Sequence, residues 1–329
     1  MARRFPLWVT ASVVALTVGF GVAAPAQAAH AATRHGPPRP PDTYVVSEEP
    51  GVVPEGIAVQ RDGRMYVTSD ATGALFAGDV RVPSMRPFAV GAVDRPSSRG
   101  VHTDGSGRVW SVGAGTLTVH SRNGRLLATR SAPDGPLGAA DLNDLAITAD
   151  AVYVTDWANP IVYRAQLRHG RPGPLQPWVD MRSAFPQFPA QYWLLNGIVA
   201  DAAGDTVLVA SNGTEAVWRI DVATRTVSQV DLGGHSFGAD GMVLAGRRLY
   251  AVLNYGAPNG VYVADLDPEL RAGTVTHQIL TDADGEAFDL PTTLARYRCR
   301  LYVVNSQGDH RPGQPPYTVS AVADPTCGE

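Results

Sequence analysis

The sequence predicts an all-β fold, a six-bladed β-propeller, and three observations carry this prediction. Six related segments recur along the 329 residues, each has the pattern of a β-hairpin, and turn formers are abundant, with 34 Gly and 26 Pro. The segments begin 44 to 53 residues apart, the spacing of four-stranded propeller blades. They are EGIAVQRDGRMYVTS (55–69), RGVHTDGSGRVWSVG (99–113), NDLAITADAVYVTD (143–156), NGIVADAAGDTVLVAS (196–211), DGMVLAGRRLYAVLN (240–254) and LPTTLARYRCRLYVVN (290–305).

Each segment follows the same order of residue types. A polar residue precedes a short apolar run, a tight turn follows, and a β-rich strand such as MYVTS or LYVVN ends the unit. A helical solenoid with a similar period is the alternative, but the apolar residues alternate and long stretches of period 3.6 are scarce. We therefore expect one propeller domain over residues 43–329, in which six blades share a packed interior.

The first 28 residues are expected to form an export signal. Arg3 and Arg4 supply a positive start, an apolar run follows from Leu7 to about Ala24, and Ala26-Gln27-Ala28 offers a cleavage site. An uncleaved anchor is the alternative, because the run approaches the ~20 residues that span a bilayer. Residues 29–42 are expected to be a Pro-rich, disordered lead-in. The sequence thus predicts a secreted protein.

The chain ends suggest how the ring closes. The extended stretch Thr43–Ser47 precedes the first segment, and we expect it to pair with the last blade. The two cysteines, Cys299 and Cys327, are expected to form a disulfide that holds the C-terminal tail to the last segment; two unpaired thiols are the alternative. No third Cys and no Cys-x-x-Cys is present, which counts against zinc fingers, iron–sulfur clusters and thioredoxin-type chemistry.

The charge of the chain restricts its partners. The formal net charge is −4 and the sequence pI is about 6.1, so the basic field needed for nucleic-acid binding is missing. We expect no nucleic-acid partner, no membrane partner once the signal is removed, and a monomer.

The leading position of each segment predicts a metal site at the centre. The innermost strands of a propeller line its channel, so equivalent positions form a ring. Four of the six leading residues offer oxygen, and carboxylates with amide carbonyls suit Ca²⁺, although another divalent cation would also fit. No His or Cys stands in the ring, which counts against zinc and copper. The six leading residues are Glu55, Arg99, Asn143, Asn196, Asp240 and Leu290.

From about Pro54 to Gln307 the sequence resembles the SMP-30/gluconolactonase family of calcium-dependent lactonases, which are related by fold to the paraoxonases and the squid-type phosphofluoridases. The matching motifs are PEG at Glu55, ND at Asn143, NG at Asn196 and ADGM at Asp240, with the closing PTTLARYRCRLYVVNSQ. The resemblance implies that these four residues are the metal ligands. The alternative for each is a surface, turn or turn-capping role, since Asn-Gly and Asp-Gly are ordinary turn pairs.

The resemblance also implies a chemistry. A calcium ion with open positions polarises a carbonyl or phosphoryl oxygen, which suits hydrolysis of lactones, esters or phosphotriesters. The resemblance implies that Asp240 is a base or nucleophile as well as a metal ligand. It also implies that Asp144 lies near the substrate. His235, in the GGHSFG loop, is a third catalytic candidate because imidazole titrates near neutrality; a solvent-exposed or structural histidine is the alternative.

Three further residues are predicted to bind the small-molecule substrate. Arg99 would face an anionic group, with a structural ion pair as the alternative. His102, three residues later, is also a candidate general base, with a solvent-exposed or structural histidine as the alternative. Trp193 precedes Asn196 and would roof the channel mouth, or else pack in a loop between blades. The neighbouring aromatic candidates for this roof are Phe185, Phe188 and Tyr192.

Two other functions remain open at this point. A non-catalytic secreted propeller would use calcium as a structural staple and bind a protein or a glycan through its loops. A strictosidine-synthase-like enzyme is the second, but that family departs from the four-ligand pattern. No G-x-S-x-G motif occurs, so a serine-hydrolase triad is not supported.

Overall fold

The computed structural model describes Ser12 and residues 39–88, 96–187, 189–255, 257–310 and 313–328. The chain divides into two units, Met1–Pro38 and Arg39–Glu329, and every described strand belongs to the second unit. Apart from Ser12, the predicted signal and most of the predicted lead-in lie outside the described residues. Within the described part of the chain, no helix is long and apolar enough to cross a bilayer.

Nearly all regular structure in the described residues is β-strand. The only helical elements there are two short 3₁₀ turns, η1 (Met181–Ser183) and η2 (Ala190–Tyr192). The first sheet has eight strands in the order β2-β3-β4-β5-β1-β25-β24-β23. Its strands are β1 (Thr43–Ser47), β2 (Pro54–Val59), β3 (Arg64–Ser69), β4 (Leu75–Asp79), β5 (Val82–Pro87), β23 (Pro291–Tyr297), β24 (Arg300–Asn305) and β25 (Tyr317–Ala323).

The remaining sheets follow the chain order, except that β13 and β14 both pair with β12. One holds β6 (Val101–Thr103), β7 (Val109–Gly113), β8 (Thr116–His120) and β9 (Leu126–Ser131). The next holds β10 (Leu142–Ile147), β11 (Ala151–Asp156), β12 (Ile161–Arg168), β13 (Arg171–Pro172) and β14 (Gln176–Asp180). Another holds β15 (Leu195–Ala200), β16 (Thr206–Ser211), β17 (Ala216–Asp221) and β18 (Val227–Gln229). The last holds β19 (Met242–Ala245), β20 (Arg248–Leu253), β21 (Gly260–Leu266) and β22 (Gly273–Ile279).

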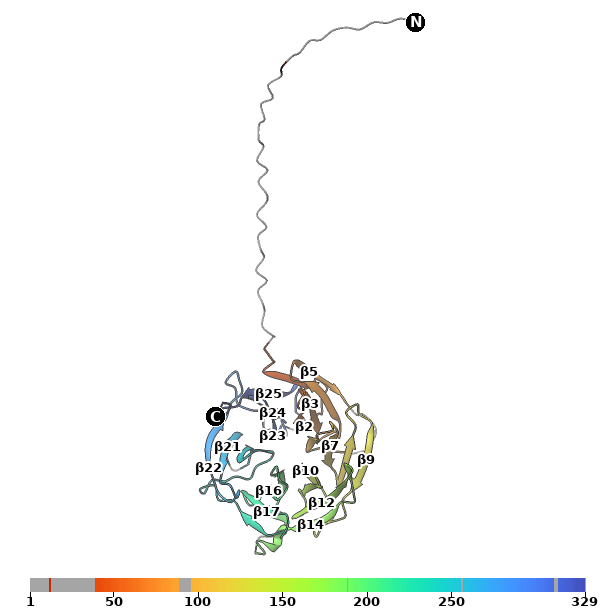
Figure 1. Cartoon of the computed structure of the whole chain (residues 1–329), viewed down its shortest axis with the longest axis vertical. Coiled ribbons are helices and arrows are strands. Elements are labelled where there is room, and N and C mark those ends of the chain that lie inside the picture. Colours follow the sequence, from red (N-terminus) through yellow and green to blue (C-terminus); the bar gives the residue numbers. More distant parts are fainter. Residues whose placement is uncertain are drawn as a thin grey trace. The chain divides into compact units, whose positions relative to one another are not determined.

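The sheets of the second unit stand around a common centre (Figure 1). The figure shows β2, β10 and β23 toward the centre and β9, β14 and β22 at the rim. Contacts between the first strands of consecutive sheets complete a cycle, β2 to β6, β10, β15, β19, β23 and back to β2. The predicted hairpins therefore supply the two inner strands of successive sheets.

The hydrophobic core lies between neighbouring sheets. Successive side chains of a strand point to opposite faces, and β16 illustrates the result. Val207 and Val209 pack in the cluster shared with the β10–β14 sheet, whereas Leu208 and Ala210 pack in the cluster shared with the β19–β22 sheet. Burial on both faces explains why the middle strands read as continuous apolar runs.

The predicted closure of the ring is confirmed. Strand β1 pairs antiparallel with β25, with Tyr44 opposite Val319, and meets β5 in parallel at Val45 and Ser84. The first and last sheets thereby become one. The predicted disulfide between Cys299 and Cys327 is also confirmed, with 5.3 Å between the Cα atoms, and it joins the β23–β24 turn to the C-terminal tail.

Candidate metal centre

Three of the candidate ligands lie where the register of an innermost strand shifts relative to its partner strand. In β2, Pro54 pairs with Ser69 and Ile57 with Val67, so the register shifts across Glu55 and Gly56. The same shift crosses Asn143 in β10 and Asn196 in β15. A bulge of this kind redirects side chains from the ladder. These three residues therefore occupy equivalent places at the inner ends of their sheets.

The sixth leading residue was predicted wrongly. In β23 the shift lies between Pro291 and Leu294, which makes Thr292, not Leu290, the equivalent of Glu55. Leu290 lies just ahead of the strand with a φ of 46°. The Thr292 hydroxyl donates to the carbonyl oxygen of Glu55 at 2.8 Å. A polar hydroxyl that is already bonded to the neighbouring strand thus occupies the sixth place.

The glycines that follow the leading residues have a packing role. A Cβ on Gly56 would lie 2.3 Å from the carbonyl oxygen of Arg99, and one on Gly197 would lie 2.5 Å from that of Asp240. Added Cβ atoms on Gly100 and Gly241 would collide with the next inner strand in the same way. The Asn196-Gly197 pair lies within β15 and is therefore not a turn. The glycine instead allows the adjacent inner strands to approach each other closely.

The candidate ligands lie where two cavities meet. A small cavity of about 10 Å³ and a larger one of about 220 Å³ share them as wall residues. The small cavity has room for about one water-sized sphere. The shared residues are the four predicted ligands, Glu55, Asn143, Asn196 and Asp240.

The donor chemistry of the ring fits a hard cation. Asn196 Nδ2 donates to Asn212 Oδ1 at 2.7 Å, and Asn212 Nδ2 donates to the carbonyl oxygen of Gly238 at 2.7 Å. This chain fixes the amide of Asn196 and leaves its Oδ1 buried, with no hydrogen-bond partner among the described residues. Buried polar atoms are normally satisfied. A cation held by Glu55, Asn143, Asn196 and Asp240 would satisfy this oxygen.

The electrostatics of the ring lead to the same conclusion. Burial raises the pKa of Asp240 to about 7, with an added rise from Asp144 and a partial offset from hydrogen bonds of Asn254 and Asn196. Burial and the charges of Asp240 and Asp144 hold the pKa of Glu55 well above its usual range. By surface area Glu55 is only partly buried, because the channel reaches a carboxylate that otherwise lies deep in the protein. Two such carboxylates resist ionisation unless a cation is present.

Asp144 and His102 form a pair on the wall of the small cavity. His102 Nε2 lies 3.2 Å from Asp144 Oδ1, and Asp144 is buried. The carboxylate also accepts the backbone N–H groups of Leu145, at 2.8 Å, and of Ile198, at 3.3 Å. Asp144 thus joins β10 to β15 and orients the imidazole of His102.

Arg99 lines the larger cavity between two carboxylates. Its Nε donates to Asp70 Oδ1 at 2.9 Å, and its Nη1 lies 2.7 Å from Asp141 Oδ1. Burial disfavours the charged form of Arg99, but the negative charges of Asp141, Asp70 and Glu55 favour it more strongly. The pKa of Arg99 is therefore raised. The structural ion pair, given above as the alternative for Arg99, is therefore present.

The other predicted residues lie away from the ring. His235 is exposed in the loop before Asp240, and it lines neither cavity. Trp193 is fully buried and packs against Trp218, with 5.2 Å between ring centroids. Phe185 and Tyr192 are exposed, and Phe188 lies outside the described residues. The geometry gives Trp193 a core position, and the catalytic role of His235 stays a prediction.

Comparison with known proteins identifies the fold. No family model and no curated protein matches the sequence. A gluconolactonase from Xanthomonas campestris superposes with a TM-score of 0.59 at 15% identity, over 85% of this chain and 89% of that chain. Mala s 1, the major allergen of Malassezia sympodialis, superposes with a TM-score of 0.62 at 14% identity, over 87% and 97%. Virginiamycin B lyase from Staphylococcus aureus gives 0.55 at 11% identity, over 85% and 98%.

The fold is that of a gluconolactonase-like β-propeller. At these identities the likeness establishes the fold alone. A gluconolactonase and a lyase share this fold, so the chemistry of this propeller has to be argued from its own channel.

Sequence reasoning missed a second layer of this propeller's channel. Asn254 Nδ2 donates to Asp240 Oδ2 at 2.6 Å and to the carbonyl oxygen of Pro291 at 2.8 Å. Asn254 ends the fifth repeated segment, directly after β20, and Asp70, Trp157 and Asn212 directly follow the second strands of their hairpins. Asn254, Asp70 and Trp157 line the larger cavity. Their shared repeat position was the signal that could have found them.

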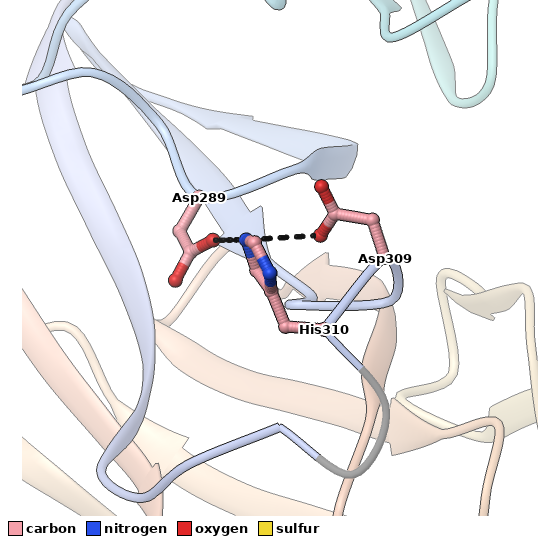
Figure 2. A group of neighbouring side chains, drawn as sticks. All are labelled: Asp289, Asp309 and His310. Carbon is pink, nitrogen blue, oxygen red and sulfur yellow. Dashed lines mark ion pairs between the residues drawn. The ribbon is translucent and has the colours of Figure 1, made fainter.

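Figure 2 shows a separate group of polar side chains, Asp289, Asp309 and His310. His310 Nε2 lies 3.7 Å from Asp289 Oδ1 and 3.4 Å from Asp309 Oδ1. All three side chains are exposed. Asp289 adjoins Leu290 and Asp309 adjoins Gly308, and both of these neighbours line the cavity. The group therefore contributes charge to the propeller surface close to the channel.

Proposed function

We propose that this chain is a six-bladed propeller that binds one calcium ion in its channel and hydrolyses lactones or related esters. The observation that carries the proposal is the convergence of Glu55, Asn143, Asn196 and Asp240 on one small cavity, with a buried Asn196 oxygen that no described donor reaches. The gluconolactonase with the same fold supports the reaction class.

The residues of the ring would divide the work. Calcium bound there supplies positive charge that polarises the carbonyl oxygen of a substrate. Glu55 and Asp240 balance the charge of the ion, and Asn254 holds one oxygen of Asp240 in place. Asp240 is the proposed base or nucleophile, and the buried Asp144, paired with His102, is the second acid/base candidate.

The larger cavity is the proposed substrate site. Its volume of about 220 Å³ lies below the range of about 300 to 1,000 Å³ for drug-sized ligands, so only a small lactone or ester would fit. Arg99, the cation in its wall, is already balanced by Asp70 and Asp141. An uncharged substrate therefore fits this cavity better than an anionic one.

We also propose that the chain is exported. The positive start, apolar run and Ala26-Gln27-Ala28 site support export, and so does the disulfide between Cys299 and Cys327, because disulfides persist in oxidising compartments.

The test is hydrolysis of a panel of small lactones and aryl esters by the metal-stripped protein, titrated with Ca²⁺. We expect activity that depends on calcium and falls at least 100-fold in Asn196→Ala and in Asp240→Asn. Matched controls are Asn123→Ala and Asp284→Asn, which alter exposed residues of the same types and should leave activity unchanged.

A different result would redirect the assignment. If calcium raises the melting temperature but no substrate is hydrolysed, the ion is a structural staple and the propeller is a binding module. If calcium neither binds nor stabilises the protein, the proposed metal centre itself is wrong.

A further inference from the structure

A second cleft opens at the outer rim of the propeller, between the β10–β14 sheet and the β15–β18 sheet. It has a volume of about 590 Å³, within the range of small-molecule sites. Its wall contains four arginines and neither Asp nor Glu. The lining cations are Arg164, Arg168, Arg171 and Arg225.

These arginines come from separate elements that converge. Arg164 and Arg168 are four residues apart on β12 and therefore lie on one face of the strand. Arg171 belongs to β13, and Arg225 belongs to the turn between β17 and β18. No ion pair with a carboxylate involves any of the four within the described part of the chain. In a chain of formal net charge −4, this is a local reversal of charge.

One of these cations is held in place and incompletely satisfied. The guanidinium of Arg164 lies 5.7 Å from the centroid of the Tyr153 ring, and Tyr153 packs on Trp178 with 4.7 Å between centroids. Arg164 Nε is buried, and no acceptor among the described residues reaches it. A buried N–H without an acceptor is destabilising. Because Nε is shielded, an anion in the cleft would meet Arg164 through the terminal nitrogens of its guanidinium.

We propose that this cleft binds a tetrahedral oxyanion, a sulfate or phosphate monoester carried by a sugar-sized ligand. The planar fork of arginine donates two parallel hydrogen bonds to such oxygens. Gln166 and Gln176 offer hydrogen bonds for hydroxyl groups, and Trp178 with the prolines of the 172–177 segment supplies an apolar wall. Binding of the anion also weakens the repulsion among the four like charges. This site is independent of the channel and of the proposed hydrolase.

The test is calorimetric titration of the full chain with inorganic sulfate, inorganic phosphate, glucose 6-sulfate, glucose 6-phosphate and glucose, at constant ionic strength. We expect saturable binding of the monoesters, weaker binding of the free anions and none of glucose. Arg168→Gln/Arg171→Gln should weaken monoester binding at least 10-fold and raise the melting temperature in the absence of anion. The matched control Arg61→Gln/Arg86→Gln removes two exposed arginines elsewhere and should change neither quantity.

Three outcomes would overturn the proposal. Equal loss of binding in the control variant would show a general effect of charge. Saturable binding of free sulfate and phosphate with no gain from the sugar would reduce the cleft to an anion site. Binding of single-stranded DNA or of anionic lipid vesicles without binding of the monoesters would assign the arginines to a macromolecular partner.

Discussion

Asn254 shows how a single amide positions the proposed metal centre. It donates to Asp240 Oδ2 and, through the same nitrogen, to the backbone of β23. The carboxylate of Asp240 is therefore oriented by a residue that lies outside the predicted ring and lines the larger cavity. Partners of this kind commonly change metal affinity by about 10- to 100-fold.

Asn254→Ala is expected to lower calcium affinity about 10-fold or more, because Asp240 loses the donor that orients it. The measurement is calcium titration by calorimetry, with the melting temperature of the metal-free protein recorded beside it. Asn123→Ala is the exposed control. Unchanged affinity together with a lower metal-free melting temperature would give Asn254 a structural role only.

Asp240 predicts the pH response of the metal-free protein. Its pKa is about 7 in the folded chain, well above the value of about 3.9 for an exposed Asp, so the folded state binds more protons between these values. Stability therefore falls as the pH rises from about 4 through 7, with a total effect on the order of 4 kcal/mol. Glu55 acts in the same direction.

Urea unfolding at pH 5, 6, 7 and 8 measures this response. The metal-free protein should lose stability across the series, Asp240→Asn should lose less, and saturating calcium should abolish the loss. A slope that is identical in Asp240→Asn would assign the pH dependence to other groups.

At the scale of the element, the glycine in each inner strand sets how closely the sheets converge on the centre. Gly197→Ala is expected to destabilise the fold by roughly 3 kcal/mol or to prevent folding, because its Cβ would meet the carbonyl oxygen of Asp240 at 2.5 Å. Gly105→Ala is the control, since that glycine has no atom within 4 Å of an added Cβ. The measurements are urea unfolding and the soluble yield of the two variants. Equal stability of the two variants would contradict the close approach.

The elements also show what the sequence could predict. The repeated order of residue types was sufficient to predict the inner strands and the three ring positions that lie within strands, because burial on two faces imposes a strong pattern. The closure was predicted from the extended stretch Thr43–Ser47 ahead of the first segment. The sixth position was missed because Thr292 and Thr293 carry no glycine to mark it. Trp193 was misplaced because Leu194, with a φ of 45°, turns the chain, so that Trp193 points into the core.

At the scale of the whole molecule, the disulfide holds the C-terminal tail to the last sheet of the propeller. Cys299 and Cys327 enclose a loop with a sequence separation of 28, and the chain-entropy model gives roughly 3 to 4 kcal/mol for such a loop. Cys299→Ser/Cys327→Ser should lower the free energy of unfolding by about this amount. The variant should leave calcium affinity unchanged, since the tail lies apart from the four candidate ligands. Thermal unfolding and calcium titration provide the measurements. A loss of affinity would reveal coupling between the tail and the channel.

The pairing of β1 with β25 has a consequence for how the protein is made. Strand β1 can pair with its antiparallel partner β25 only after residues 317–323 have been synthesised. Until then the nascent chain carries unpaired strand edges at both ends of an open arc, and such edges recruit other chains. The ring of sheets therefore closes only once β25 has been made, and a chain that stops short of it keeps edges that favour aggregation.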